Sequence, residues 1–188
     1  MPSLPESDRQ ALLRLARTSI ETAVRHNRLP EEIPQGGVFS LRCGVFVTLH
    51  SGKKLRGCIG VIEGANPLGE SVIRCAVSAA REDPRFSQVK GGELNNLTIE
   101  ISLLSPLQRI PAGQIEIGRH GLVVQRGQRR GLLLPQVAVE HGLSRERFLE
   151  ETCRKAGLAP DSWKDPDTEV YAFTCEIMSE QEPAAAGN

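Results

Sequence analysis

The feature that most constrains the fold is a strict alternation of apolar and polar residues in the segment 96–104. From residue 97 it reads Leu-Thr-Ile-Glu-Ile-Ser-Leu, so every second side chain is apolar. Successive side chains of a β-strand point to opposite faces of the sheet. The segment is therefore predicted to be a strand with one buried face and one polar face.

Other segments also predict strands. Gly44–His50 and Leu55–Ile62 flank a short turn at Ser51–Lys54, which predicts a β-hairpin. Thr168–Ile177 is predicted to be one further strand, in the same antiparallel sheet as 96–104, with residues 171, 173, 175 and 177 facing inward. Shorter strands are predicted in the middle of the chain, at Gln114–Ile117, Leu122–Gln125 and Gly131–Leu134.

Three helices are also predicted, the first of them before all the strands. Ser7 is expected to cap the first and Ser144 the last, which runs to Ala156, whereas Asn66 caps a middle helix that ends near Arg81. Separate helices and antiparallel strands, without regular βαβ units, indicate an α+β fold.

Composition excludes several classes of function. Among 188 residues, 23 Lys and Arg balance 23 Asp and Glu, so no net field attracts nucleic acid or an anionic membrane surface. No apolar run is long enough to span a membrane, and the N-terminus lacks the regions of a signal peptide. The five cysteines are an odd number without C-x-x-C spacing, which favours reduced thiols in the cytoplasm.

The densest cluster of chemistry-bearing residues is Leu55–Gly60. On a strand, Arg56 and Cys58 point the same way, and a guanidinium beside a thiol lowers the thiol pKa. Gly57 and Gly60 weaken the strand, which indicates close approach of a backbone or a ligand. In the plainer interpretation Cys58 is a small buried apolar residue and Arg56 belongs to a surface ion pair, and spacing alone favours it.

Several sequence blocks together resemble the AMMECR-one domain family, whose prokaryotic members are called AmmeMemoRadiSam system protein A. The resemblance covers Arg9 to Met178 and rests on blocks that occur in this order: 55–60, 83–86, 99–102, 118–121, 133–136 and 155–158. It implies a main domain around an antiparallel sheet flanked by helices, with a smaller middle subdomain. It also implies association with Memo-like and radical-SAM proteins, but no particular reaction.

We therefore predict one domain over residues 1–179 with a smaller middle subdomain, and a disordered tail over residues 180–188. The tail prediction rests on the absence of apolar periodicity after Ser179.

The other candidate site residues each have a structural alternative. Asp83 and Arg85 either bind a ligand or form an ion-paired turn after a helix. His120 suits proton transfer near neutral pH, although a histidine between glycines in a turn is usually exposed and idle. Glu100 is either a solvated sheet residue or a carboxylate in a cleft.

Gln136 and Lys155 also belong to the predicted binding set. The Gln136 amide could instead hold a turn, and the Lys155 ammonium could offset the dipole of a helix. No pair of candidate ligands has metal-site spacing, so neither a metal nor another cofactor is predicted.

Two functional hypotheses follow. In the first, an enzyme or enzyme component uses Cys58 as nucleophile or redox thiol on a small anionic substrate, with Arg56 orienting the anion and His120 or Glu100 moving protons. In the second, a non-catalytic adaptor or regulatory protein binds a partner or small ligand through the same face. Both hypotheses predict that Arg56, Cys58 and one of Glu100, His120 or Lys155 line a single concave site.

Overall fold

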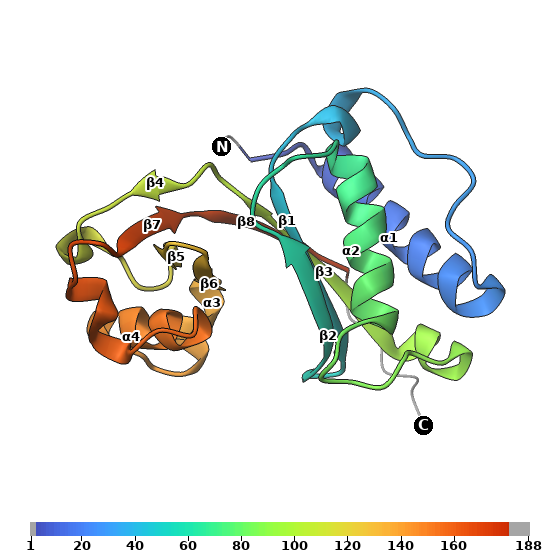
Figure 1. Cartoon of the computed structure of the whole chain (residues 1–188). Coiled ribbons are helices and arrows are strands. Elements are labelled where there is room, and N and C mark those ends of the chain that lie inside the picture. The colour runs from blue at the N-terminus through green and yellow to red at the C-terminus, as the bar shows by residue number, and fades with distance from the viewer. Residues whose placement is uncertain (1–2, 181–188) are drawn as a thin grey trace. The chain divides into compact units, whose positions relative to one another are not determined.

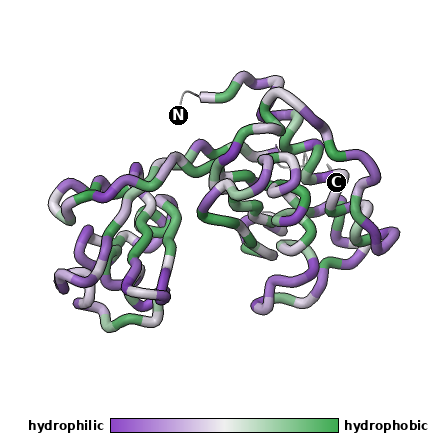
Figure 2. The backbone as a smooth tube through the Cα atoms, turned by 45° about the horizontal axis from the view of Figure 1, so that its top comes forward, coloured by the Kyte–Doolittle hydropathy of each residue, from purple (hydrophilic) through white to green (hydrophobic). Residues whose placement is uncertain are grey.

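The computed structural model of the chain describes residues 3–180 and consists of two compact units. The first contains residues 3–104 together with residues 176–180, and the second contains Ser105–Cys175. Each unit has its own antiparallel sheet, its own helices and its own apolar stretches (Figures 1 and 2). The α+β class, with a sheet-centred main part and a smaller middle part, is confirmed.

The first unit is built on a four-stranded sheet with the order β2-β1-β3-β8. Its strands are β2 (Lys54–Val61), β1 (Gly44–Ser51), β3 (Leu97–Leu104) and β8 (Cys175–Ser179). Strand β1 pairs antiparallel with both β2 and β3, so the predicted hairpin and the predicted strand at 96–104 are neighbours. Strand β2 is an edge of this sheet.

Two helices cover one face of that sheet, α1 (Glu6–His26) and α2 (Leu68–Arg81), as Figure 1 shows. The apolar set of the alternating strands faces them: Val47, Leu49, Ile99 and Ile101 are fully buried. The polar set, which includes Thr48 and Glu100, therefore lies on the opposite face. Short 3₁₀ helices η1 (Gly37–Ser40) and η2 (Gly91–Asn96) complete the unit.

The second unit has a sheet with the order β4-β7-β5-β6. Its strands are β4 (Gln108–Arg109), β7 (Glu169–Phe173), β5 (Gly121–Arg126) and β6 (Arg129–Leu133). Helices α3 (Pro135–Glu140) and α4 (Arg145–Lys155) and the 3₁₀ helices η3 (Ala112–Gln114) and η4 (Pro160–Lys164) accompany it. Its separate core centres on Phe148, which is fully buried, and Ser144 caps α4 as predicted.

The prediction of one strand over Thr168–Ile177 was wrong. The segment divides at Thr174 into β7 and β8, which belong to different sheets. At the break, the Thr174 carbonyl accepts from the Ser105 amide at 2.9 Å, and the Thr174 amide donates to the Ser105 hydroxyl at 2.9 Å. The strand therefore ends at Phe173, and only β8, the later part of the segment, joins the sheet of β3.

The predicted inward set of that segment was also mostly wrong. Only one of the four positions is buried, Phe173, whereas Tyr171 and Cys175 are half-buried and Ile177 is exposed. The buried residues of β7 and β8 are instead Val170, Ala172, Phe173 and Met178.

Smaller predictions also need correction. Gln114 ends η3, and 115–117 form no strand. Helix α1 begins at Glu6 after Pro5, so Ser7 lies inside it, and Pro67 rather than Asn66 is the N-cap of α2.

Glu180, the first residue of the predicted disordered tail, makes defined contacts with the first unit. The Glu180 amide donates to the Ile99 carbonyl, and its carboxylate accepts from the Ile99 amide and from the Arg17 guanidinium. Residues 181–188, the remainder of that prediction, lie outside the described residues.

Candidate functional site

The candidate site is built on the edge strand β2, where a β-bulge displaces Arg56. Leu49 of β1 pairs with Gly57, but His50 pairs with Leu55, so Arg56 is the extra residue. A bulge breaks the simple alternation of faces and re-aims the side chain at that position. The prediction that Arg56 and Cys58 share one face rested on unbroken alternation, which does not exist at Arg56.

The Arg56 guanidinium is engaged within the fold. It donates to both carboxylate oxygens of Glu93, at 2.9 and 3.2 Å, and to the Ser87 carbonyl at 2.8 Å. Glu93 also accepts from the Lys90 amide at 2.7 Å, which closes the first turn of η2. The Arg56 guanidinium holds the pKa of Glu93 below its usual range. Arg56 therefore ties β2 to η2, the ion-pair role of the plainer interpretation.

Cys58 lies half-buried on the polar face of the sheet. Its sulfur accepts from the Thr48 hydroxyl at 3.3 Å, and Thr48 pairs in register with both Cys58 and Glu100. Residues in register share a face, so these three side chains form one row across β2, β1 and β3. The sheet thus brings Cys58 and Glu100 into the same row, with Thr48 between them.

Burial raises the pKa of the Cys58 thiol. The Thr48 hydrogen bond and the Arg85 charge lower this pKa, and the negative charges of Asp83 and Glu100 raise it. The expectation that Arg56 lowers this pKa was therefore wrong. The guanidinium that lowers the pKa of Cys58 is that of Arg85, and the effect of burial is larger. At neutral pH the thiol stays protonated.

Asp83 and Arg85 form a clamp on the free edge of β2, which we call the Asp83–Arg85 clamp. The Asp83 carboxylate accepts from the Cys58 amide at 2.8 Å, and the Arg85 guanidinium donates to the Cys58 carbonyl at 3.2 Å. The two side chains join each other through bonds of 2.9 and 2.7 Å. Bonding to Arg85 holds the pKa of Asp83 well below its usual range. The clamp satisfies the backbone groups that an edge strand leaves open.

Close packing explains both glycines of the block. A Cβ on Gly57 would lie 2.1 Å from the Ala79 carbonyl oxygen of α2. A Cβ on Gly60 would lie 2.2 Å from the ring of Phe46, its partner in register on β1. Backbone and ring, rather than a ligand, occupy the space that the missing side chains leave.

The remaining three candidates belong to the second unit. The His120 Nδ1 accepts from the Glu116 amide at 3.1 Å and so closes a turn before β5. Gln136 lies in the first turn of α3, and its Oε1 is buried with no hydrogen-bond partner among the described residues. Lys155 is the last residue of α4, where its ammonium offsets the helix dipole, and it lines a cavity of that unit with Leu133 and His141.

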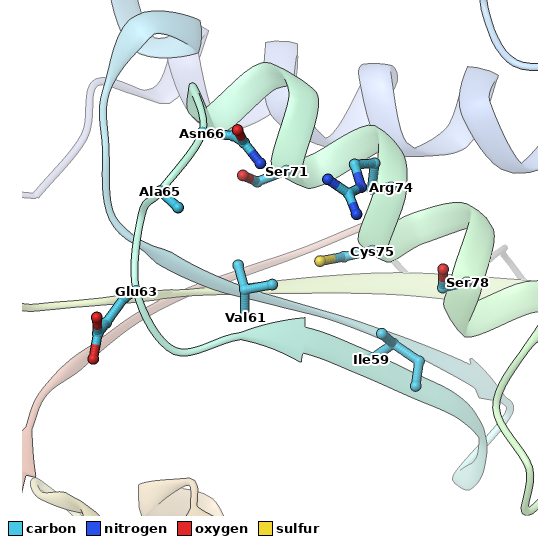
Figure 3. Close-up of a pocket in the computed structure, with 9 residues that line it drawn as sticks. All are labelled: Ile59, Val61, Glu63, Ala65, Asn66, Ser71, Arg74, Cys75 and Ser78. Carbon is cyan, nitrogen blue, oxygen red and sulfur yellow. The ribbon is translucent and has the colours of Figure 1, made fainter.

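A pocket that the sequence analysis missed lies beside α2 in the first unit (Figure 3). We call it the α2 pocket, and its volume is about 320 Å³. It is lined by Ile59, Val61, Glu63, Ala65, Asn66, Ser71, Arg74, Cys75 and Ser78. The i, i+3 and i+4 spacing of Ser71, Arg74, Cys75 and Ser78 was the available signal, because residues so spaced share one helix face.

Residues 3–180 contain neither a cluster of metal-binding side chains nor a membrane-spanning helix. No group of three or more His, Cys, Asp or Glu side chains is placed to hold a metal ion there. No helix in that range is long and apolar enough to cross a membrane. None of the five cysteines, all of which lie within that range, forms a disulfide.

The fold and the site define a two-unit α+β protein whose edge strand is held by an aspartate–arginine clamp. The chain belongs to the AMMECR1 family, whose model matches residues 13–178. A Thermococcus kodakarensis protein is 47% identical over 186 residues, which span 92% of this chain and 90% of that protein. A Methanothermobacter thermautotrophicus protein is 46% identical over 187 residues, 94% of this chain and 96% of its own. The crystal structure of an uncharacterized Pyrococcus horikoshii protein matches with a TM-score of 0.91 and 42% identity, covering 96% of this chain and 95% of that one.

Proposed function

We propose that this AMMECR1-family protein is a non-catalytic adaptor that binds a partner protein or a small ligand through the face of the first unit that carries Cys58. The observation that carries the proposal is that the charged side chains near Cys58 are already bonded within the fold. Arg56 is bound by Glu93, and Asp83 and Arg85 are bound to each other and to the backbone of Cys58. These charges hold β2 in place and are not available to activate a substrate.

The chemistry of Cys58 supports the same proposal. A cysteine nucleophile needs a base in hydrogen-bond reach or a lowered pKa. Burial raises the pKa of Cys58, and within residues 3–180 its sulfur is hydrogen-bonded by a threonine hydroxyl rather than a histidine. Glu100 is a carboxylate whose charge further raises that pKa. A neutral, half-buried thiol fits a packing or contact role.

Partners and compartment belong to the proposal as well. We propose the Memo-like and radical-SAM proteins that the family resemblance implies as its partners, and the cytoplasm as its location, since a reducing compartment keeps free thiols free. Co-purification of the tagged full chain with each class of partner tests the proposed partners.

The competing enzyme hypothesis, with Cys58 as nucleophile and Arg56 orienting an anionic substrate, predicts the opposite for the pKa and the reactivity of the Cys58 thiol.

Alkylation of Cys58 against pH distinguishes the two hypotheses. The native chain is treated with iodoacetamide, and the Cys58 peptide is quantified by mass spectrometry. We expect a titration midpoint above the free-thiol value of about 8.5 and a rate well below that of the same peptide in the unfolded chain, which serves as the control. A midpoint below about 7.5, with native alkylation faster than in the unfolded chain, would instead establish an activated nucleophile and refute the adaptor proposal.

A further inference from the structure

The α2 pocket has two chemically different walls. Strand β2 contributes Ile59 and Val61, and the thiol of Cys75 on α2 continues this apolar side (Figure 3). Burial raises the pKa of Cys75 to about 11, so this thiol carries no charge at neutral pH. The other side is polar, with Asn66 just before α2, and Ser71 and Arg74 within its first two turns.

Three of the polar groups on that side make no hydrogen bond or ion pair with any residue between 3 and 180. Ser71 is only 5% exposed, yet its hydroxyl has no hydrogen-bond partner within residues 3–180. The Asn66 amide and the Arg74 guanidinium likewise make no hydrogen bond or ion pair within that range. A hydroxyl that lines a pocket without a protein partner is open to a hydrogen bond with water or a ligand. Figure 3 shows Asn66, Ser71 and Arg74 along the same side of the pocket, with Asn66 and Ser71 near the start of α2 and Arg74 farther along it.

Charge limits the ligand that these groups can hold. Arg74, an exposed residue that lines the pocket, supplies the positive charge of the polar side. The fourth polar residue of the helix face, Ser78, donates its hydroxyl to Glu82 at 2.6 Å and is therefore occupied. Glu63 lines the pocket as well, and its carboxylate disfavours a ligand with several negative charges.

We propose that the α2 pocket binds a small monocarboxylate with a compact apolar body. The carboxylate bonds to the planar fork of Arg74 and to the Ser71 hydroxyl and Asn66 amide, which are all donors. The apolar body packs on Ile59, Val61 and the neutral Cys75. The volume of about 320 Å³ lies at the lower end of the range for small-molecule sites. This site is separate from the Cys58 face, so it does not depend on the proposed adaptor function.

The test uses four probes on the full chain: benzoate and hexanoate, and their neutral amides. Binding is measured by ligand-observed NMR titration into the millimolar range, the affinity expected for fragments of this size. The variants are Arg74→Gln, which removes the charge, and Arg74→Lys, which keeps the charge but loses the fork. Arg14→Gln removes another exposed arginine, in the middle of α1, and is the matched control. Circular dichroism checks that each variant folds.

We expect saturable binding of at least one carboxylate and at least tenfold weaker binding of its amide. Arg74→Gln should weaken carboxylate binding at least tenfold, Arg74→Lys by an intermediate factor, and Arg14→Gln not at all. Ser71→Val, which removes the hydroxyl at similar volume, should weaken it severalfold. The proposal is overturned if no carboxylate binds saturably, if an amide binds as well as its carboxylate, or if Arg74→Gln and Arg14→Gln have the same effect.

Discussion

Replacing Asp83 with asparagine should destabilise the first unit by removing the charge on which the Asp83–Arg85 clamp depends. The Asp83 side chain is 2% exposed and its carboxylate accepts four hydrogen bonds: one from the Cys58 amide, one from the Arg85 amide and two from the Arg85 guanidinium. Asparagine keeps one acceptor oxygen but places an NH₂ group where a donor already points. The substitution thus leaves donors without acceptors at the edge of β2.

The size of the stability loss follows from how deeply Asp83 and Arg85 are buried. Breaking a buried ion pair by removing one partner costs about 3–5 kcal/mol. Half of the Arg85 side chain is exposed, so its guanidinium can turn to water and recover part of that loss. We therefore expect Asp83→Asn to lower the free energy of unfolding by about 2–3 kcal/mol near neutral pH.

The pH dependence gives a second, independent test. The pKa of Asp83 is lowered in the folded protein, so the stabilisation is present above the pKa of an unfolded aspartate, about 3.9, and is lost as the pH falls toward the folded value. The stability difference between the wild-type protein and Asp83→Asn should consequently narrow as the pH falls below about 4.

Urea denaturation followed by circular dichroism measures both effects. The control is Glu31→Gln, which breaks an exposed pair with Arg28 and should cost less than about 1 kcal/mol. If Asp83→Asn lowered the free energy of unfolding no more than the control does, the stabilising role of the Asp83–Arg85 clamp would be refuted. A stability difference that stays constant between about pH 7 and about pH 3 would refute the assigned origin of its energy.

The remaining predictions concern packing, the C-terminal segment and the second unit. Gly57→Ala should cost about 1–3 kcal/mol, because the new Cβ meets a backbone carbonyl of α2, whereas Gly92→Ala in open space should be nearly neutral; equal losses in urea denaturation would contradict this. Glu180→Gln should lower stability by about 1–3 kcal/mol because it weakens the partly buried pair with Arg17, and an unchanged melting temperature would disprove the anchoring role. Ser144→Ala should destabilise α4 by about 1 kcal/mol through loss of its N-cap, and amide hydrogen exchange that is no faster in α4 would argue against it.

The sequence predicted the elements whose pattern is local. The alternation at 96–104 identified β3, and the two strands around Ser51–Lys54 identified the hairpin of β1 and β2. Each strand of the sheet must bury one face, so its own residues alternate between apolar and polar. The pattern can therefore be read from one strand without knowing its neighbours. For the same reason Ser144 was predicted correctly as a cap, since its bond to the Arg147 amide is made within four residues.

Other features were decided only by tertiary structure. No local pattern marks Thr174 as the point where one predicted strand passes from one sheet to another, because the change depends on its bonds to Ser105. The bulge at Arg56 likewise depends on how β2 pairs with β1. It interrupts the alternation of faces, on which the prediction that Arg56 and Cys58 point the same way was based.

The same distinction applies to the site. The sequence alone singled out Arg56, Cys58, Asp83 and Arg85 as residues of unusual chemistry, but not which of them would meet. Glu93, the partner of Arg56, lies 37 residues away in the chain, and Asp83 lies 25 residues from the Cys58 amide that it binds. The pKa of Cys58 rises because burial is set by everything that surrounds the thiol, whereas sequence reasoning could weigh only its neighbours in the chain. Composition and periodicity thus determined the fold class and most elements, and long-range contacts determined the charge and the role of the side chains.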